Sequence, residues 1–325
     1  MDQITVAVIG LGYMGKRHLE IWHQLGARVV LCSRDDKSSR EYAETYGYPL
    51  YTDYMELLEK EKPDAVSICL PTALHYETVR QFLTHGIAVL CEKPFTTDSA
   101  EAEELCRLAE EKNVLLMVGH VVRFTRAYAY LKRCIEEKRF GALKMLEMHR
   151  HTTQPTWSAG NWLADVAHSG GAAKDLHIHE SDILCHYLGI PQSVLCTGDY
   201  TACTTVYTYP DYPAVSASAS WRSVPEYPFT AGYDAVFEHA VVQFADFTVT
   251  LHEEGKVSYP LLQEDFPQYL RSENALENEI VYFYHCLITG ETPELCPPRE
   301  SLAAMRINEA ELRSLQSRCP VSLGE

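Results

Sequence analysis

The segment Ser169–Asp182 reads SGGAAKDLHIHESD and holds two side chains that could move a proton. A Gly-Gly turn that opens a helix would place Asp175 and His179 four residues apart, on one helix face. Histidine titrates near neutral pH, and a neighbouring aspartate can orient the ring and stabilise its charged form. This spacing predicts a proton-transfer pair. The ordinary alternatives are a helix-start charge at Asp175 and a core histidine at His177 or His179.

The step from His177 to His179 also raises the question of a metal site. Residues two apart in a helix point about 200° away from each other, so one ion cannot readily take both imidazoles. Elsewhere in the sequence, no cluster of cysteine, histidine and carboxylate completes a ligand set. We therefore predict no metal.

A glycine-rich turn, GLGYMG, lies near the N-terminus between a short apolar run and a helical pattern. Gly10 would permit the tight turn, Gly12 the approach of a pyrophosphate, and Gly15 the close packing of helix on strand. The helix N-terminus would add N–H donors and a positive dipole end. The turn therefore predicts a dinucleotide site that includes Tyr13 and Met14. A purely structural glycine turn is the alternative.

The end of the second predicted strand bears on the choice of dinucleotide. An acidic residue about 20 positions after the glycine turn would bind the ribose 2′-hydroxyl of NAD. Ser33 and Arg34 stand there instead, and a hydroxyl beside a guanidinium suits a 2′-phosphate better. Asp35 and Asp36 come later, and we interpret them as helix-start residues. The sequence thus favours NADP over NAD.

The tripeptide Glu92-Lys93-Pro94 follows another apolar run, residues 87–91. Ligands of a doubly wound sheet bind beyond the carboxyl ends of its strands. We therefore expect Lys93 to project toward the nicotinamide, although a lysine at a strand end is commonly just solvated. Glu92 would lie beside it.

The pattern of apolar residues changes near residue 122. Before it, continuous apolar strands alternate with amphipathic helices, which predicts a parallel sheet covered on both faces. After it the alternation stops, and period-2 strands predict an open, mostly antiparallel sheet with a few helices. We expect a doubly wound (Rossmann) domain at residues 1–122 and an α+β domain at residues 123–325. The expected strands include residues 4–9, 28–32, 65–70, 87–91 and 114–118, then 143–149, 193–200, 203–209, 215–221, 236–244 and 248–252.

The amino-acid composition indicates which classes of partner and which cellular compartment to expect. Lysine and arginine total 28 against 45 acidic residues, and a net charge of −17 disfavours nucleic acid and anionic membranes as partners. No apolar run reaches the ~18 residues that a membrane helix needs. No secretory signal is expected ahead of the first strand. Eleven cysteines without paired spacing predict reduced thiols and a cytoplasmic protein.

These motifs in this order resemble the glucose–fructose oxidoreductase / inositol dehydrogenase / MocA (Gfo/Idh/MocA) family along essentially the whole chain. Beyond the glycine turn and the Glu-Lys-Pro tripeptide, the resemblance includes Pro71-Thr72-xx-His75, Arg123-Phe124, Gly170-Gly171, Thr289-Gly290 and Glu300 to Arg306. The sequence departs from the family at Ser33-Arg34, where an acidic residue is common. It also departs at His177, where glycine is common, and at 238–243, where a Gly-x-x-Gly is common.

The resemblance implies an NAD(P)-dependent oxidoreductase that acts on sugars, cyclitols or related polyols. It assigns Lys93, Asp175 and His179 to catalysis, and it lines the cofactor with Pro71, Thr72 and His75. Candidate substrate contacts are Arg123, Trp162, His177 and Tyr233.

The expected reaction is reversible hydride transfer, with His179 taking the hydroxyl proton, Lys93 steadying the alkoxide and Asp175 holding the imidazole. Two other readings stay open: a nicotinamide-dependent glycosidase that oxidises its sugar transiently, and a non-enzymatic dinucleotide sensor. An open sheet face has to be covered. We therefore expect a homodimer or homotetramer through the C-terminal sheet.

Overall fold

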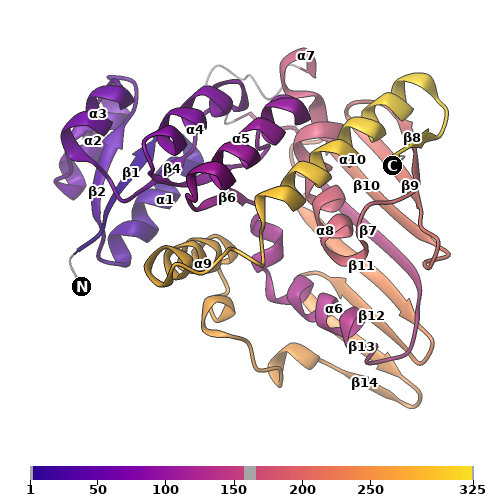
Figure 1. Ribbon diagram of the computed structural model, residues 1–325. Helices are drawn as coiled ribbons and strands as arrows, with labels where there is room; N and C mark the ends of the chain where they lie inside the picture. The colour runs from indigo at the N-terminus through magenta and orange to yellow at the C-terminus, as the bar shows by residue number, and fades with distance from the viewer. Residues whose placement is uncertain (1–2, 157–165, 324–325) are drawn as a thin grey trace. The chain divides into compact units, whose positions relative to one another are not determined.

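The computed structural model describes residues 3–156 and 166–323. The chain forms two compact units, which Figure 1 shows in colour along the sequence. The first unit comprises residues 1–121 together with 276–302, and the second comprises 122–275 together with 303–325. The expected fold class is confirmed: a parallel doubly wound sheet is followed by a mostly antiparallel sheet.

The sheet of the first unit has six strands in the order β3-β2-β1-β4-β5-β6, and every pair in it is parallel. Its central strands are apolar and buried along nearly their whole length, as a sheet covered on both faces requires. The strands are β1 Thr5–Ile9, β2 Arg28–Cys32, β3 Leu50–Tyr51, β4 Ala65–Ile68, β5 Ala88–Glu92 and β6 Leu116–Gly119.

Six helices accompany this sheet, and capping residues begin three of them. Asp36, Asp53 and Asp98 each accept a hydrogen bond from a backbone N–H of the first turn, a contact that stabilises a helix by about 1 kcal/mol. The helices are α1 Tyr13–Gln24, α2 Lys37–Tyr46, α3 Tyr54–Glu61, α4 His75–Thr84, α5 Ser99–Lys112 and, from much later in the chain, α9 Ala275–Thr289. The Trp22 ring of α1 meets Phe283 of α9 edge to face, with centroids 6.3 Å apart.

The sheet of the second unit has nine strands in the order β14-β13-β12-β11-β7-β10-β9-β8-β15. Only the central β7–β10 pair is parallel among the pairs described. The strands are β7 Leu143–Thr153, β8 Ser193–Gly198, β9 Ala202–Thr208, β10 Val215–Arg222, β11 Thr230–Phe237, β12 Ala240–Ala245, β13 Thr248–Glu253, β14 Lys256–Ser258 and β15 Val321–Ser322.

One expected strand is wrong. Residues 236–244 were predicted as a single strand, but the chain reverses at Glu238 and His239, which are exposed and join β11 to β12. Val236 pairs with Val241 across this hairpin. The apolar pattern continues through the turn without glycine or proline, so the sequence carries no strong turn signal there.

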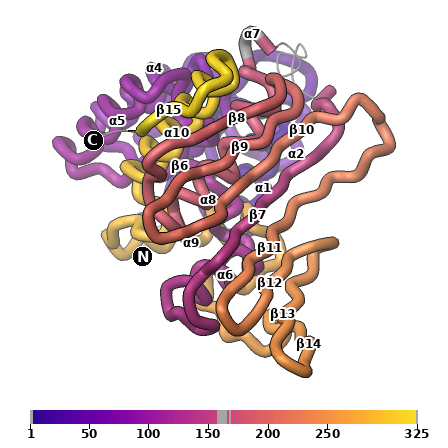
Figure 2. Tube along the Cα trace, turned by 90° about the vertical axis from the view of Figure 1, so that its right-hand side faces the viewer, coloured from indigo at the N-terminus to yellow at the C-terminus, as the bar shows by residue number. Residues whose placement is uncertain are grey.

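Helices cover one face of this second sheet. Figures 1 and 2, seen at right angles, both show α6 Arg126–Glu136, α8 Ile178–Leu188 and α10 Pro298–Ser317 on the same side of it. Leu146, Met148 and Arg150 of β7 are buried toward the helices, and the residues between them point to the opposite face. A further short helix, α7, spans Val166–Ser169, and a π-helical turn spans Ala172–Leu176.

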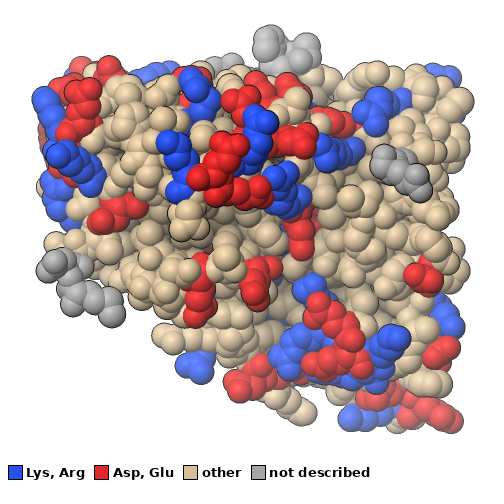
Figure 3. Space-filling model, viewed as in Figure 1, with Lys and Arg blue, Asp and Glu red and all other residues tan. Residues whose placement is uncertain are grey.

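The surface and the cysteines agree with the composition. Figure 3 shows lysine and arginine side chains lying among acidic ones on the face in view. Arg133 and Arg139 both pair with Glu264. Each of the eleven cysteines is a thiol, and Cys319 alone is exposed. Within the described ranges, no helix is both long enough and apolar enough to cross a bilayer.

Candidate active site

The glycine turn is built on two very close approaches. An added Cβ on Gly15 would stand 1.7 Å from the carbonyl oxygen of Gly10, so only glycine lets α1 pass this near to the end of β1. Gly10 itself has φ +93°, and a Cβ there would stand 2.6 Å from the Cys69 carbonyl oxygen. Both positions require the residue that the motif supplies.

Gly12 differs from both. It is the N-cap of α1 with φ −73°, and no heavy atom of the described residues lies within 4 Å of the point where its Cβ would stand. The space beside Gly12 at the N-terminus of α1 is therefore open, next to an exposed Tyr13 and a half-buried Met14. A pyrophosphate fits this cradle, since the helix N-terminus offers donors and a positive dipole end.

The end of β2 offers a hydroxyl and cations rather than a carboxylate. Ser33 Oγ lies 3.4 Å from the Leu11 N–H, and the neighbouring Arg34 side chain is 80% exposed. Asp36 accepts from the Ser39 N–H at 2.8 Å and caps α2, as its position in the sequence led us to expect. The backbone contact with Ser39 is the main reason that the pKa of Asp36 lies below its ordinary value.

Sequence reasoning missed a second cation at this place. Lys16 Nζ lies 2.8 Å from Ser38 Oγ and 4.2 Å from the centre of the Tyr42 ring. The signal was available, because Lys16 follows directly on the last glycine of the turn and so stands in the first turn of α1.

The loop after β4 is held to the loop after β5. Pro71 precedes a 3₁₀ turn at Thr72–Leu74, and His75 then begins α4. The buried His75 ring places Nε2 2.7 Å from the Leu70 carbonyl oxygen and Nδ1 2.9 Å from that of Pro94. Burial lowers the pKa of His75. The His75 ring therefore joins the two loops. Pro71 and Thr72 remain the predicted cofactor contacts in this loop.

Lys93 directly follows β5 at the same sheet edge as the glycine turn. Ile9 of β1 pairs with Ile68 of β4, which pairs with Cys91 of β5. Parallel strands in register bring their carboxyl ends together. The glycine turn, the Pro71 loop and the half-buried Lys93 thus lie along one edge of the first unit.

Glu92 points into the first unit. Its Oε1 lies 3.0 Å from His18 Nε2 of α1, and both side chains are buried. Glu279 of α9 joins them, and the three side chains offer nitrogen and oxygen atoms within 4.8 Å of one another. This group ties α1, β5 and α9 together beneath Lys93. Glu279 lies 187 positions from Glu92, and no local pattern signals the contact.

The Asp175–His179 segment is not one regular helix. Gly170 and Gly171 have positive φ, and a Cβ on Gly171 would stand 2.3 Å from the Tyr200 carbonyl oxygen. A π-helical turn follows, and the N–H of His177 donates to the carbonyl of Ala172 at 2.8 Å. The α-helix predicted to start near Asp175 begins only at Ile178.

Burial separates the members of this segment. Asp175 and His179 are half-buried, whereas His177 and Glu180 are inaccessible to solvent. Glu180 accepts from Arg150 Nε at 2.8 Å, and burial raises the pKa of Glu180. His177 Nε2 lies 3.0 Å from Thr205 Oγ1. This burial argues against the predicted contact of His177 with substrate.

Two more residues that were expected to contact substrate bind protein groups inside the second unit instead. Arg123 forms a buried two-point ion pair with Asp182, at 2.6 and 2.9 Å. Tyr233 is 0% exposed and donates to the carbonyl of Ala127 at 2.8 Å. Because both are buried against protein, their geometry supports a structural role. Trp162 lies outside the described residues.

Lys93 belongs to the first unit, and Asp175 and His179 belong to the second. Their meeting around one substrate therefore stays a prediction. Each unit separately presents its own part of the predicted site: a cofactor edge in the first, and a carboxylate and an imidazole after a Gly-Gly turn in the second.

Comparison with protein families gives two matches. A model described as an oxidoreductase family with an NAD-binding Rossmann fold, GFO/IDH/MocA, matches residues 4–120. The model of the GFO/IDH/MocA C-terminal domain matches residues 128–231. Together they cover more than half of the chain, in the order that the motifs indicated.

Comparisons with single proteins and structures support the same family. The 2,7-anhydro-N-acetylneuraminate hydratase of Mediterraneibacter gnavus is 30% identical over 62% of this chain, but that match spans only 54% of the hydratase. The inositol 2-dehydrogenase of Rhizobium meliloti is 26% identical over 98% of this chain and 99% of its own length. The structure of a levoglucosan dehydrogenase with NADH and levoglucosan has a TM-score of 0.85 over 100% of both chains, at 17% identity, and shows the shared fold.

The two glycines predict two distinguishable variants. Gly12→Ala adds a methyl group to open space at an ordinary φ, so the melting temperature should stay within about 2 °C. The same methyl should weaken NADPH binding at least about tenfold, which corresponds to about 1.4 kcal/mol. Gly15→Ala should lower both binding and the melting temperature, because overpacking strains the crossing of α1 and β1.

Fluorescence titration and thermal unfolding of the purified chain measure the two quantities. Undiminished NADPH affinity in the folded Gly12→Ala variant would contradict the assignment of this turn to the cofactor.

Proposed function

The chain belongs to the GFO/IDH/MocA family of oxidoreductases, and from this premise we propose that it transfers a hydride between a nicotinamide cofactor and a sugar, cyclitol or related polyol. The observation that carries the proposal is the open cradle over Gly12, at the same sheet edge as Lys93. Support also comes from relatives whose names include an inositol 2-dehydrogenase and a UDP-N-acetylglucosamine 3-dehydrogenase.

The protein's part in the proposed reaction is proton handling and charge stabilisation. A bound nicotinamide would supply or accept the hydride. His179 removes the proton of the substrate hydroxyl, and Asp175 holds the imidazole and shares its charge. Lys93, as an ammonium, stabilises the negative charge that develops on the substrate oxygen. Residues 1–122 then serve the cofactor, and residues 123–325 serve the substrate.

Catalytic variants test this assignment. A positioned histidine is worth ~10²–10⁴ in rate, so His179→Ala should lower kcat at least about a hundredfold. Lys93→Ala should do the same, because it removes charge stabilisation that is strongest in the transition state. Exposed positions His239 and Lys112 provide the matched controls His239→Ala and Lys112→Ala, which should keep wild-type turnover.

Activity is measured by absorbance of the reduced nicotinamide with a panel of sugars and cyclitols and both cofactors. Near-full turnover in either catalytic variant would refute the assigned role.

We propose further that the cofactor is NADP. Arg34 and Lys16 are cations, Ser33 and Ser38 are hydroxyls, and all four stand around the end of β2 and the start of α1. A 2′-phosphate would find charge-assisted donors there, and the ribose of NAD would find no carboxylate at position 33 or 34.

Cofactor preference has its own expected outcome. Hydrogen bonds to charged groups contribute about 1.5–3 kcal/mol, so Arg34→Ala should raise the Kd of NADPH roughly tenfold to a hundredfold. The Kd of NADH should change little, because NADH lacks the phosphate. Titration of both reduced cofactors by fluorescence measures this, and an equal loss for the two would show that Arg34 does not read the phosphate.

A second candidate is a reaction with transient rather than net oxidation, such as glycoside cleavage. The supporting observation is the 30% identity to a relative named as a hydratase, a class of reaction without net redox change. The activity panel separates the two: hydride transfer changes the nicotinamide absorbance, whereas the second candidate releases product while the absorbance stays constant.

We propose a cytoplasmic homodimer or homotetramer. The eleven thiols favour a reducing compartment. The face of β7 that points away from the helices carries Glu147, His149 and His151 on a broad sheet, which a second copy would cover. Light scattering should give a mass of two or four chains, and a mass of one chain at micromolar concentration would contradict the proposal.

A further inference from the structure

A carboxylate that the proposed mechanism does not use lies inside the second unit. Glu311 of α10 is 1% exposed and accepts three hydrogen bonds. Tyr207 OH donates at 2.6 Å, Asn308 Nδ2 at 2.8 Å and Ser181 Oγ at 2.9 Å. Buried carboxylates are costly unless they are paired or protonated. No lysine or arginine is among the described partners of Glu311 in this network.

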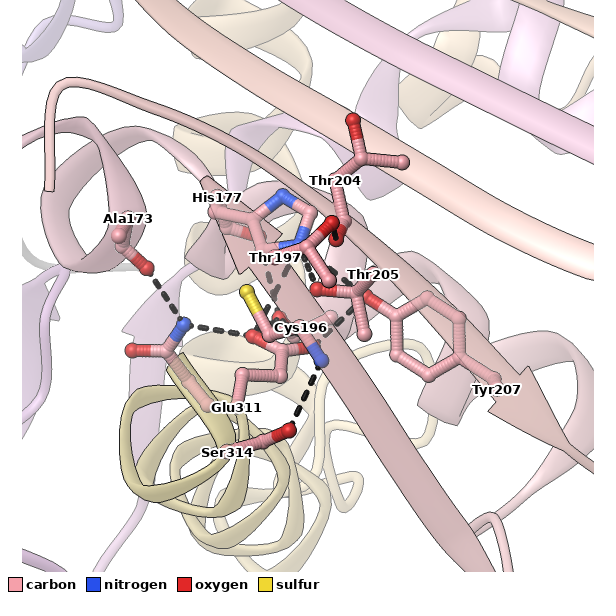
Figure 4. A network of polar contacts seen from close by, with 11 residues as sticks. Ala173, His177, Cys196, Thr197, Thr204, Thr205, Tyr207, Glu311 and Ser314 are labelled. Carbon is pink, nitrogen blue, oxygen red and sulfur yellow. Dashed lines mark hydrogen bonds and ion pairs between the residues drawn. The ribbon is translucent and has the colours of Figure 1, made fainter. Parts of the chain in front are cut away.

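His177 faces this carboxylate. Its Nε2 lies 3.8 Å from Glu311 Oε2, 3.2 Å from Tyr207 OH and 3.0 Å from Thr205 Oγ1. Figure 4 shows the His177 ring directed at Glu311, with Tyr207 on the neighbouring strand β9 beside both. The Tyr207 hydroxyl contacts both groups and therefore links the imidazole to the carboxylate for proton exchange.

The same network holds the segment that carries Asp175 and His179. Asn308 Nδ2 also donates to the Ala173 carbonyl at 2.9 Å, which fixes the π-helical turn from below. Ser181 Oγ lies 3.1 Å from the His177 carbonyl in the first turn of α8. The anchors at Ala173, His177 and Ser181 bracket both members of the proposed catalytic pair.

Other titratable groups face the network from the elements around it. The charge of Glu311 acts on the pKa of Cys196 in β8, of Cys203 in β9 and of Tyr209, which directly follows β9. On the other side of His177, Glu180 of α8 and Arg150 of β7 form a buried ion pair. The Arg150 charge disfavours a charged His177, and the Glu180 charge favours it.

We propose that Glu311, together with His177, is a protonatable positioning site that sets the placement of Asp175 and His179. The site exchanges a proton near neutral pH, and the hydrogen bonds to Ser181 and Asn308 transmit the change to the segment above. This inference rests on the proposed function, because it assigns a purpose to the positions of that pair.

The protonation preferences of the two groups oppose each other. Burial raises the pKa of Glu311 to about 7, even though Tyr207, Asn308 and Ser181 pull it down. Burial lowers the pKa of His177 to about 4. From these directions, the Glu311 contribution to stability is full below its ordinary pKa of 4.5 and is lost as the pH rises toward 7. The His177 contribution is full above 6.5 and is lost as the pH falls toward 4.

Thermal unfolding between pH 4 and 8 tests the site with the whole chain and no ligand. Relative to wild type, Glu311→Gln should gain about 3–6 °C in melting temperature as the pH rises from 4.5 to 7. His177→Gln should show the reverse trend, losing a similar amount relative to wild type between pH 4 and 6.5. The exposed Glu254 provides the control Glu254→Gln, whose difference from wild type should stay flat.

Tyr207→Phe supplies a second measurement in case Glu311→Gln does not fold. Loss of the Tyr207 hydroxyl removes a donor that lowers the pKa of Glu311. The stability of this variant relative to wild type should therefore continue to fall above pH 7. Parallel curves for wild type, Glu311→Gln and Tyr207→Phe would overturn the proposal.

The effect of Glu311 on the placement of the Asp175–His179 segment is measured separately from the pH dependence of unfolding. Amide exchange in residues 172–182 should differ between wild type and Glu311→Gln more at pH 8 than at pH 5.5, and an equal difference at both would overturn the positioning role.

With a substrate from the activity panel, Glu311→Gln should lower kcat roughly tenfold and weaken its pH dependence near 7. KM should stay within about twofold. Wild-type chain without turnover would count against the proposed function alone, since the unfolding and exchange measurements need no substrate.

Discussion

The crossing of α1 over the end of β1 is the contact on which the cofactor half of the molecule depends. An added Cβ on Gly15 would overlap the carbonyl oxygen of Gly10 at 1.7 Å. This proximity aims the N-terminus of α1 at the carboxyl edge of the sheet. The parallel register of β1, β4 and β5 then delivers the Pro71 loop and Lys93 to the same edge. The close approach of the backbone at Gly15 and Gly10 therefore brings the helix N-terminus, the strand ends and the loop residues to one edge of the sheet.

Several charged side chains are buried in both units, and most of them have charged partners. The His18–Glu92–Glu279 group lies beneath Lys93 in the first unit. In the second unit, Arg123 pairs with Asp182, and Arg150 pairs with Glu180. Removing one member of such a pair leaves an uncompensated buried charge, which is strongly destabilising. These contacts hold the site residues in place, and none of the acidic partners touches solvent to any large extent.

Glu311 stands apart from these pairs because its partners are neutral donors and a neutral imidazole. Solvent cannot reach it, so protonation is the remaining way to relieve its charge. The neighbouring segment contains a π-helical turn, and such turns recur at functional sites. A carboxylate of this kind beneath the Asp175–His179 segment gives the protein a means of coupling acidity to the geometry of the proposed catalytic pair.

Much of the fold was readable in the sequence, because its signals are local. Glycines at positions 10, 12 and 15 specify the turn, and continuous apolar strands alternating with amphipathic helices specify a parallel sheet. Asp36 was interpreted as a helix-start residue, and the structure confirms it as the N-cap of α2. The hairpin between β11 and β12 was missed because its turn residues, Glu238 and His239, carry no turn preference.

By itself, the sequence determined the fold class, the glycine turn and the identities of the candidate catalytic groups, since each depends on residues within a few positions of one another. Only the tertiary structure decided that α9 returns to the first unit to bring Glu279 to Glu92, and that α10 brings Glu311 to His177. It also decided that Arg123, His177 and Tyr233 are buried among protein partners. The reason is physical: the burial and pairing of these side chains depend on segments from about 30 to nearly 190 residues away, and no local pattern encodes those contacts.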